Sequence, residues 1–245
     1  SSSFNIGTHS QVNGSSDTYV GYAIGANDGT TSTNTQGDIN STVQVDPSGC
    51  FSIVTYTGTL SGAGVETVGH GLSVAPSYII TKVIASGNWW VFSDGQTSWN
   101  YGMNLNDTTA STDKSGNGSM SAPTTTVFST NNTEGLNDSG GNIAYCFANC
   151  EGYIKSGVYE GNGNADGAYV YCGFRPAFVI SKAIDVADSW FILDETRDPS
   201  NEAVKYLQSN SSAAEAEHAN IGIDILSNGF KCTRAPNSLN GSGND

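Results

Sequence analysis

Few residues of this chain could perform catalysis, and His70 is the first to consider. It lies in the segment VGHGL, residues 68–72. A histidine can act as a general base or a metal ligand near neutral pH. No serine–aspartate arrangement stands near it in sequence, and the corresponding position of a similar segment later in the chain is Cys172. His9 and His218 lie in loop-like segments. We therefore expect His70 to be a structural residue.

Acidic residues are the second candidates, because glycosidic bonds are cleaved by two carboxyl groups held close together. An alternating pattern such as ExDxxE, which places carboxylates on one side of a strand, does not occur. Asp194 and Glu195 are neighbours, so on a strand their side chains point to opposite sides. Asp94 and Asp194 end two similar segments, which favours a structural role. We expect no enzymatic activity.

The glycine-rich segment GNGNADG, residues 161–167, contains three side chains with oxygen atoms that suit Ca²⁺. These are Asn162, Asn164 and Asp166. The segment lacks a complete calcium-loop pattern, and the same residues are common in turns. A calcium site here is one expectation, and ordinary turn chemistry is the alternative. No other cofactor is expected.

Aromatic residues offer a possible contact surface. Trp89 and Trp90 are adjacent, so one of them points into the core and the other outward. Trp90 matches Trp190 in the second half of the chain, so we expect Trp90 in the core. Trp89, with Trp99 and Tyr101 nearby, then forms an exposed aromatic platform. Such a platform contacts either a neighbouring subunit or a glycan.

The five cysteines give no disulfide framework or zinc motif, because their number is odd and no CxxC pair occurs. Cys146 and Cys172 lie within apolar, strand-like runs, and free cysteine packs like a small hydrophobic residue. We expect buried free thiols. The spacing of Cys146 and Cys150 also allows one bridge.

The elements that position these residues occur in two similar series about 100 residues apart, which indicates one structural unit used more than once. The matched segments are GCFSIVTYTG (49–58) with GYIKSGVYEG (152–161), APSYIITK (75–82) with RPAFVISK (175–182), and NWWVFSD (88–94) with DSWFILD (188–194).

Short runs rich in β-branched and aromatic residues, bounded by Gly, Asn, Pro and Ser, predict strands throughout the chain. The fold class is all-β, with short strands whose spacing predicts an antiparallel sandwich or barrel and with little helix. Residues 201–208 have a weak helical signal of two turns. The expected strands lie near residues 18–24, 51–56, 66–68, 77–85, 89–93, 102–105, 125–129, 143–148, 153–159, 168–172, 177–184, 190–194, 206–207, 221–226 and 230–233.

Three domains follow from the register of the repeats. Residues 36–148 form repeat 1, and residues 149–245 form repeat 2, which lacks its final strand. Residues 1–35 resemble the closing strands of a preceding repeat, because NGSSDTY (13–19) is similar to LNDSGGN (136–142) and to LNGSGND (239–245). One explanation is that the sequence is part of a longer repeat protein.

The other explanation is strand donation, in which a strand of one copy fills the open sheet edge of the next. A sandwich without one of its strands exposes unpaired backbone groups, which is costly. The donated strand would consist of Thr18, Tyr19, Val20, Gly21, Tyr22, Ala23 and Ile24.

Composition restricts the partners. Nine Lys and Arg residues stand against 23 Asp and Glu, which gives a net charge of −14. Nucleic acid is excluded as a partner, because phosphate binding needs clustered basic residues. No apolar run is long enough to insert into a membrane. Loop-rich, glycine-rich composition with interleaved aromatics is typical of extracellular or virion β proteins.

Several segments together resemble a known family. They are NIAYCFANCEGYIKSGVYEGNGNADGAYVYCGFRPAFVISK (142–182), Trp190, the Arg-Asp-Pro of residues 197–199 and IDILSNGFK (223–231). This set is similar to the repeated concanavalin A-like β-sandwich domain of marine bacteriophage tail fibre and virion structural proteins. The resemblance covers most of residues 36–245. It implies tandem antiparallel β-sandwich repeats of the concanavalin A-like or jelly-roll type and a virion location, and it carries no catalytic motif.

The expectation for function is a non-enzymatic bacteriophage virion or appendage protein, of the tail fibre or surface fibre type, that assembles through its repeats. Its partners would be other copies of itself or other virion proteins, and its location the virion or the extracellular space. The first alternative is an adhesin that binds host surface glycan. The second is a tail enzyme that cleaves glycans.

Overall fold

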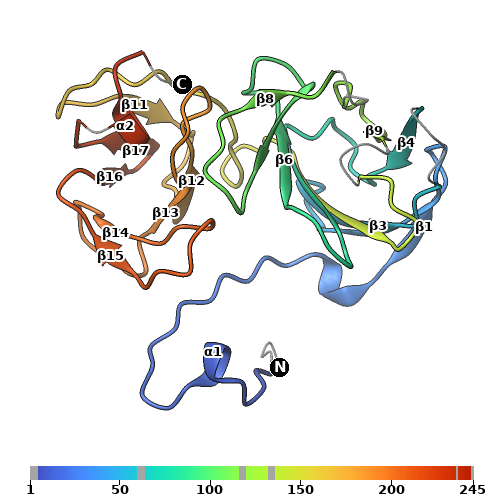
Figure 1. Cartoon of the computed structure of the whole chain (residues 1–245), viewed down its shortest axis with the longest axis horizontal. Coiled ribbons are helices and arrows are strands. Elements are labelled where there is room, and N and C mark those ends of the chain that lie inside the picture. Colours follow the sequence, from blue (N-terminus) through green and yellow to red (C-terminus); the bar gives the residue numbers. More distant parts are fainter. Residues whose placement is uncertain (1–4, 60–63, 116–119, 132–135, 236, 244–245) are drawn as a thin grey trace.

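The chain folds almost entirely into antiparallel β-sheets, which confirms the all-β fold class. Among the described residues helix is confined to α1 (Ser10–Asn13), η1 (Asn27–Gly29) and α2 (Asn237–Asn240). Figure 1 shows two lobes side by side, with the N-terminal residues beneath them. The computed structural model describes residues 5–59, 64–115, 120–131, 136–235 and 237–243.

Repeat 1 is built on one eight-stranded sheet whose strands alternate between buried and more exposed positions. That alternation defines an inner face, which covers the core, and an outer face. In spatial order the sheet contains β1 (Ser32–Asn34), β2 (Ser41–Val45), β3 (Phe51–Tyr56), β10 (Asn142–Phe147), β5 (Tyr78–Val83), β6 (Trp90–Ser93), β7 (Tyr101–Asn104) and β8 (Thr112–Asp113). Because β1 belongs to this sheet, repeat 1 begins before residue 36, its expected start.

A second layer, the pair β4 (Val65–Gly69) and β9 (Val127–Asn131), supplies Val68 and Phe128 to the same core as the inner face of the large sheet. The core between the layers includes Val54, Ile79 and Phe92, all at most 1% exposed. Trp90 belongs to this core, as expected. Repeat 1 is therefore a sandwich of one broad and one narrow sheet.

Repeat 2 has fewer and shorter strands around its own core. Leu193, Ile223 and Ile225 lie at its centre, each at most 1% exposed. The strands are the sheet β11 (Tyr169–Tyr171), β17 (Gly229–Cys232) and β16 (Ile223–Leu226), the pair β12 (Phe178–Ser181) and β13 (Phe191–Asp194), and the pair β14 (Lys205–Tyr206) and β15 (Ala216–Glu217).

The two repeats pack through a third cluster that joins Val91 and Met103 of repeat 1 to Trp190 of repeat 2. Trp190 is 3% exposed, and its Nε1 donates a hydrogen bond of 2.8 Å to the carbonyl oxygen of Asn104. A backbone hydrogen bond from Ser111 to the Ile184 carbonyl adds a second tie. Burial of an indole with its N–H paired makes this a specific interface.

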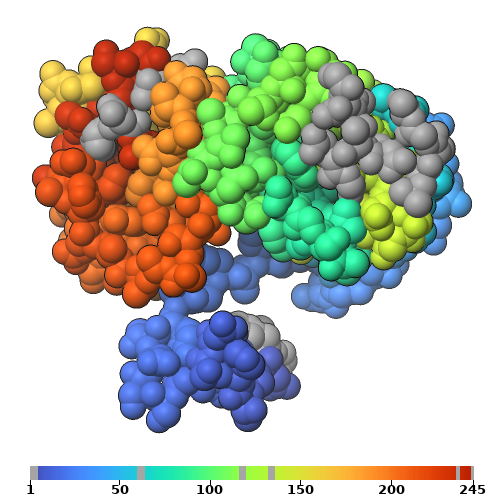
Figure 2. All heavy atoms as spheres, viewed as in Figure 1, coloured from blue at the N-terminus to red at the C-terminus, as the bar shows by residue number. Residues whose placement is uncertain are grey.

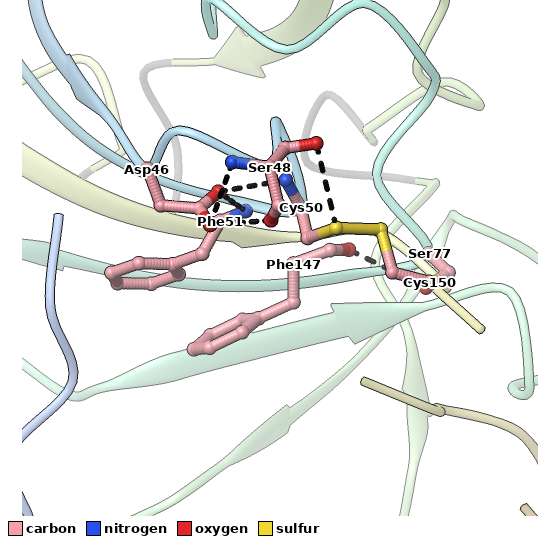
Figure 3. The surroundings of a disulfide bond; sticks show 7 residues. All are labelled: Asp46, Ser48, Cys50, Phe51, Ser77, Phe147 and Cys150. Atoms are coloured by element: carbon pink, nitrogen blue, oxygen red, sulfur yellow. Dashed lines mark hydrogen bonds between the residues drawn. A yellow bond between two sulfur atoms is a disulfide. The ribbon is translucent and has the colours of Figure 1, made fainter. Parts of the chain in front are cut away.

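Cys50 and Cys150 form a disulfide with their Cα atoms 6.0 Å apart (Figure 3), so the expectation of free thiols is wrong for this pair, and the Cys146–Cys150 bridge that the spacing allowed does not form. The turn before Cys50 is held by Asp46, whose carboxylate accepts hydrogen bonds from the N–H groups of Cys50 and Phe51. The remaining thiols, Cys146, Cys172 and Cys232, are free. The disulfide ties the start of β3 to the start of repeat 2.

Three expected elements are absent. Residues 18–24 and 153–159 contain no strand, and residues 201–208 contain no helix but the short strand β14. In the first two segments the sequence has strand-forming residues, but the described chain places no sheet neighbour beside them. A strand needs that neighbour, because its backbone groups are satisfied only across the ladder.

Candidate functional site

One corner of the fold occurs in both repeats with the same hydrogen bonds. The hydroxyl of Tyr56 donates to the Leu136 carbonyl oxygen at 2.5 Å, and the hydroxyl of Tyr159 donates to the Leu239 carbonyl oxygen at 2.8 Å. These residues are matched by the sequence repeat. The repeats therefore correspond in three dimensions, and each position of one can be compared with its counterpart.

A buried asparagine completes this corner in both repeats. Asn137 Oδ1 accepts the backbone N–H of Thr59 at 2.8 Å, and Asn240 Oδ1 accepts the backbone N–H of Asn162 at 3.0 Å. Both asparagines are fully buried. A buried amide is retained where it satisfies buried backbone groups, so each asparagine fixes the path of its own loop.

In repeat 1 the strand that follows this corner is β10, which lies between β3 and β5 and pairs with both. Ala144 stands opposite Val54 on one side and opposite Thr81 on the other. All three residues are at most 1% exposed. Strand β10 therefore closes the centre of the sheet.

In repeat 2 the counterparts of β3 and β5 are residues 153–159 and β12. Strand β12 pairs with β13 on one side, and the described residues place no strand on its other side. We call the space between residues 153–159 and β12 the vacant strand position. The exposed hydrophobic side chains of these elements are Tyr153, Val158 and Phe178.

One side-chain contact crosses the vacant strand position. The hydroxyl of Tyr159 lies 3.2 Å from Ser181 Oγ. Their counterparts in repeat 1 are Tyr56 and Thr81, which lie on the two strands that flank β10, and burial raises the pKa of Tyr56 to about 12. Tyr159 thus reaches its partner across a gap like the one that β10 fills in repeat 1.

The N-terminal arm, residues 5–31, approaches this same strand. Tyr22 packs against Phe178 of β12 with ring centroids 5.0 Å apart, and its hydroxyl donates a hydrogen bond of 2.7 Å to Asp194 of β13. Figure 2 shows the arm extending away from the two lobes. Its residues Ile6, Tyr19 and Ile24 are about half exposed.

Asp194 is the centre of the contact that holds the arm. Besides Tyr22 it binds Arg197, whose Nε lies 2.5 Å from Asp194 Oδ2 and whose Nη1 approaches Glu215. Burial alone would raise the pKa of Asp194, but the hydrogen bonds from Tyr22 and Arg197 hold it below its usual value. Burial and the bond to Asp194 raise the pKa of Tyr22 to about 12. Asp194 therefore serves as a charged anchor.

The structure separates the three residues of the expected aromatic platform. Trp89 lies on the outer face, where it stacks on Tyr145 with ring centroids 6.2 Å apart. Trp99 packs against the core of repeat 1. By strand alternation Tyr101 shares the outer face with Met103, at the other end of the β6–β7 pair from Trp89. No single platform forms, and the contact role of each residue stays a prediction.

The match between Trp90 and Trp190 is wrong by one residue. Val179 pairs with Leu193 as Ile79 pairs with Phe92, so Phe191 is the counterpart of Trp90. Trp190 therefore corresponds to Trp89. The backbone N–H of each tryptophan donates a hydrogen bond to an asparagine Oδ1, that of Asn106 in repeat 1 and that of Asn210 in repeat 2. The extra residue lies in the loop after Lys182, where the sequence match alone could not place it.

Asn162, Asn164 and Asp166 form a turn through their own backbone. Asn162 Oδ1 accepts the N–H of Asn164 at 2.9 Å, and Asn164 Oδ1 accepts the N–H of Asp166 at 3.0 Å. Asp166 also pairs with Lys231. The oxygens are thus engaged in turn bonds, and the described residues include no cluster of three or more His, Cys, Asp or Glu side chains that could hold a metal. Calcium binding stays a prediction.

His70 is fully buried, and both ring nitrogens have partners. Nδ1 accepts the Leu72 N–H at 3.1 Å, so Nε2 carries the proton and donates to the Thr124 carbonyl oxygen at 3.2 Å. Burial lowers the pKa of His70. The neutral imidazole, with one hydrogen bond at each ring nitrogen, ties the backbone at Leu72 to the backbone at Thr124.

A cleft of about 280 Å³ opens at the junction of the repeats, near Trp99. Its polar groups include Asp94, Ser77 and Asn149. Burial raises the pKa of Asp94, while Lys155 lowers it by a smaller amount. The cleft combines one indole with several hydrogen-bonding groups.

These features define an all-β protein built from a duplicated antiparallel sandwich, in whose second copy the described residues leave one strand position unfilled. The chain belongs to the family of the domain of unknown function DUF7483, which matches residues 1–245. No curated protein and no solved structure matches the chain. No helix among the described residues has the length and apolar character needed to cross a bilayer.

Proposed function

We propose that this protein is a non-enzymatic structural component of a bacteriophage virion, of the tail fibre or surface fibre type, that assembles with copies of itself or with other virion proteins. The observation that carries the proposal is the unpaired edge of β12 beside an exposed apolar arm. Exposed strand edges and apolar segments are normally covered in a functioning protein. The resemblance to phage fibre repeats supports the virion location.

The arm and the edge favour assembly over catalysis. Asp194, the most buried carboxylate of repeat 2, accepts hydrogen bonds from Tyr22 and Arg197. A carboxylate engaged in this way serves as an anchor for chain segments. The repeat architecture then supplies stiff units, and the arm supplies the connection between them.

The experiment is a measurement of mass across concentrations. Sedimentation velocity of the chain between about 1 and 100 μM should show oligomers that grow with concentration, since exposed strand edges associate by mass action. A variant lacking residues 1–24 should sediment as a monomer. Tyr169→Ser, which reduces exposed apolar surface outside the arm, serves as a control and should assemble normally. A full-length chain that stays monomeric throughout would contradict the proposal.

A second candidate function, glycan binding at a host surface, is favoured by the cleft near Trp99. Sugars stack on aromatic rings and hydrogen bond to polar groups of the kind that Asp94 and Asn149 present. A glycan array with wild-type protein and Trp99→Ala decides this. Binding that the substitution abolishes supports an adhesin, whereas an empty array contradicts it. Release of reducing sugars from a bound polysaccharide would indicate the tail-enzyme alternative instead.

A further inference from the structure

Residues 18–24 of the N-terminal arm correspond in sequence to β10, the strand that closes repeat 1. Asn13 matches Asn137, and the same offset places Val20 at Ala144 and Tyr22 at Cys146. Ala144 and Cys146 are buried on the inner face of repeat 1. The alternating residues Val20, Tyr22 and Ile24 would likewise share one face of a strand. Residues 18–24 thus carry a β10-like sequence but pair with no strand among the described residues.

We propose that residues 18–24 of a second copy of this chain occupy the vacant strand position of repeat 2. They would pair with β12 in the antiparallel register that β10 adopts with β5. That register places Val20 opposite Ser181 and Tyr22 opposite Val179, since Ala144 lies opposite Thr81 and Cys146 opposite Ile79. This inference rests on the proposed assembly function and names its partner and its contact.

Side-chain volumes around the vacant strand position fit this occupant. In repeat 1 the small Ala144 lies between Val54 and Thr81. In repeat 2 the counterparts of these neighbours are the smaller Gly157 and Ser181. A Cβ atom added at Gly157 would meet nothing within 4 Å, so space is open at this point. The larger Val20 would fill that space, and close packing requires such compensation.

Side chains of β12 are more exposed than their counterparts in β5, as expected where the neighbouring strand is missing. Thr81 is 1% exposed beneath β10, whereas its counterpart Ser181 is partly exposed. Phe178, at the start of β12, is 42% exposed on the outer face, where Tyr22 of the same chain contacts it, whereas in the proposed register Tyr22 would face the core beside Val179. An added strand would bury Ser181 and would pair the free backbone groups of β12.

The arm of a second copy is a better source than the arm of the same chain. In its own chain the arm reaches β12 through the side chain of Tyr22, and residues 18–24 remain outside the sheet. Ile6, Val12 and Tyr19 of the arm stay exposed there. Exchange between copies covers both the arm and the open edge, and it does so in a head-to-tail manner that extends into a fibre or closes into a ring.

A mixing experiment with cysteine variants tests the source and the register. Chains carrying Val20→Cys are mixed with chains carrying Ser181→Cys under mild oxidation. Directly opposed residues lie within disulfide reach, so a covalent heterodimer should form. The control partner is Ile180→Cys, whose side chain points to the other face, and its yield should be at least about tenfold lower. Wild-type chains report any background from Cys172.

The outcomes separate this inference from the proposed function. Cross-linking within a single Val20→Cys/Ser181→Cys chain, with none in the mixture, overturns the second copy as the source. Assembly by sedimentation without either cross-link refutes strand pairing at β12 and leaves assembly standing. A monomeric chain without cross-links refutes both.

A peptide experiment on wild-type protein does not depend on the folding of the variants. A fluorescent peptide of residues 16–26 should bind saturably and should block the cross-link in the mixture. The same peptide with Val20→Asp should bind at least about tenfold more weakly, because it would place an unpaired charge against the core. Equal binding of the two peptides overturns the proposed pairing.

Discussion

The disulfide between Cys50 and Cys150 should control the stability of repeat 1. The two residues are 100 positions apart, and the loop that they close contains every strand from β3 to β10. Closing a loop of that length removes conformational entropy from the unfolded chain worth about 4.7 kcal/mol at 25 °C. Measured effects are usually smaller, so we expect Cys50→Ala/Cys150→Ala to lose about 3–5 kcal/mol of unfolding free energy.

Urea denaturation followed by tryptophan fluorescence measures this loss. With a slope of about 2 kcal/mol per molar urea, the midpoint of repeat 1 should fall by about 2 M. Wild-type protein in reducing buffer should unfold at the same midpoint as the double variant. Cys172→Ala changes a free thiol and should shift the free energy by less than about 1 kcal/mol.

A double variant whose urea midpoint stays within about 0.3 M of the wild-type value would refute stabilisation by loop closure, because closure would then contribute almost nothing to the unfolding free energy. Such a result would mean that the unfolded chain is already compact around residues 50–150. If the double variant lost unfolding free energy but reduced wild-type protein did not, the loss would instead come from the packing of Cys50, which is 4% exposed.

Three further predictions concern the arm, the interface and the repeated corner. Tyr22→Phe should weaken the arm contact by about 1 kcal/mol, so limited proteolysis of the arm should be about fivefold faster at pH 7. The depressed pKa of Asp194 stabilises the fold above pH about 4, and this contribution is lost as pH falls through the folded-state pKa, so Tyr22→Phe should move acid unfolding to higher pH. Trp190→Ala should cost about 3–5 kcal/mol and split one urea transition into two, because it removes the indole between the repeats. Asn137→Ala and Asn240→Ala should each cost about 1–3 kcal/mol in thermal melts, and unequal losses would argue against equivalent corners.

The duplicated fold was predictable because its signals are local. Strands such as β3 and β5 carry β-branched and aromatic runs bounded by turn residues, and the same runs recur in repeat 2. The alternation of a strand between two faces predicted that one of Trp89 and Trp90 is buried. The choice of Trp90 was correct although the match to Trp190 behind it was not, because its true counterpart Phe191 is buried as well. Such patterns are fixed by neighbouring residues in the chain.

Features that depend on distant contacts were not predictable from one sequence. The Cys50–Cys150 bridge joins residues that only the closed sandwich brings together. The register of Trp190 depends on one inserted loop residue, and a shift of one residue moves a side chain to the other face of a sheet. Sequence similarity alone paired Trp190 with the wrong tryptophan for this reason.

The vacant strand position poses a physical question that the duplication alone does not answer. If repeat 2 had simply lost a strand, residues 153–159 and β12 could approach to the usual spacing of about 4.8 Å and pair directly. The contact between Tyr159 and Ser181 crosses that position instead. The corner at Leu239 and Asn240 fixes Tyr159 and the loop at Asn162 beside it. On the proposed pairing, a strand from a second copy would satisfy the backbone groups of β12 that no described strand pairs, and the small Gly157 would favour a donor with a residue larger than alanine at its centre.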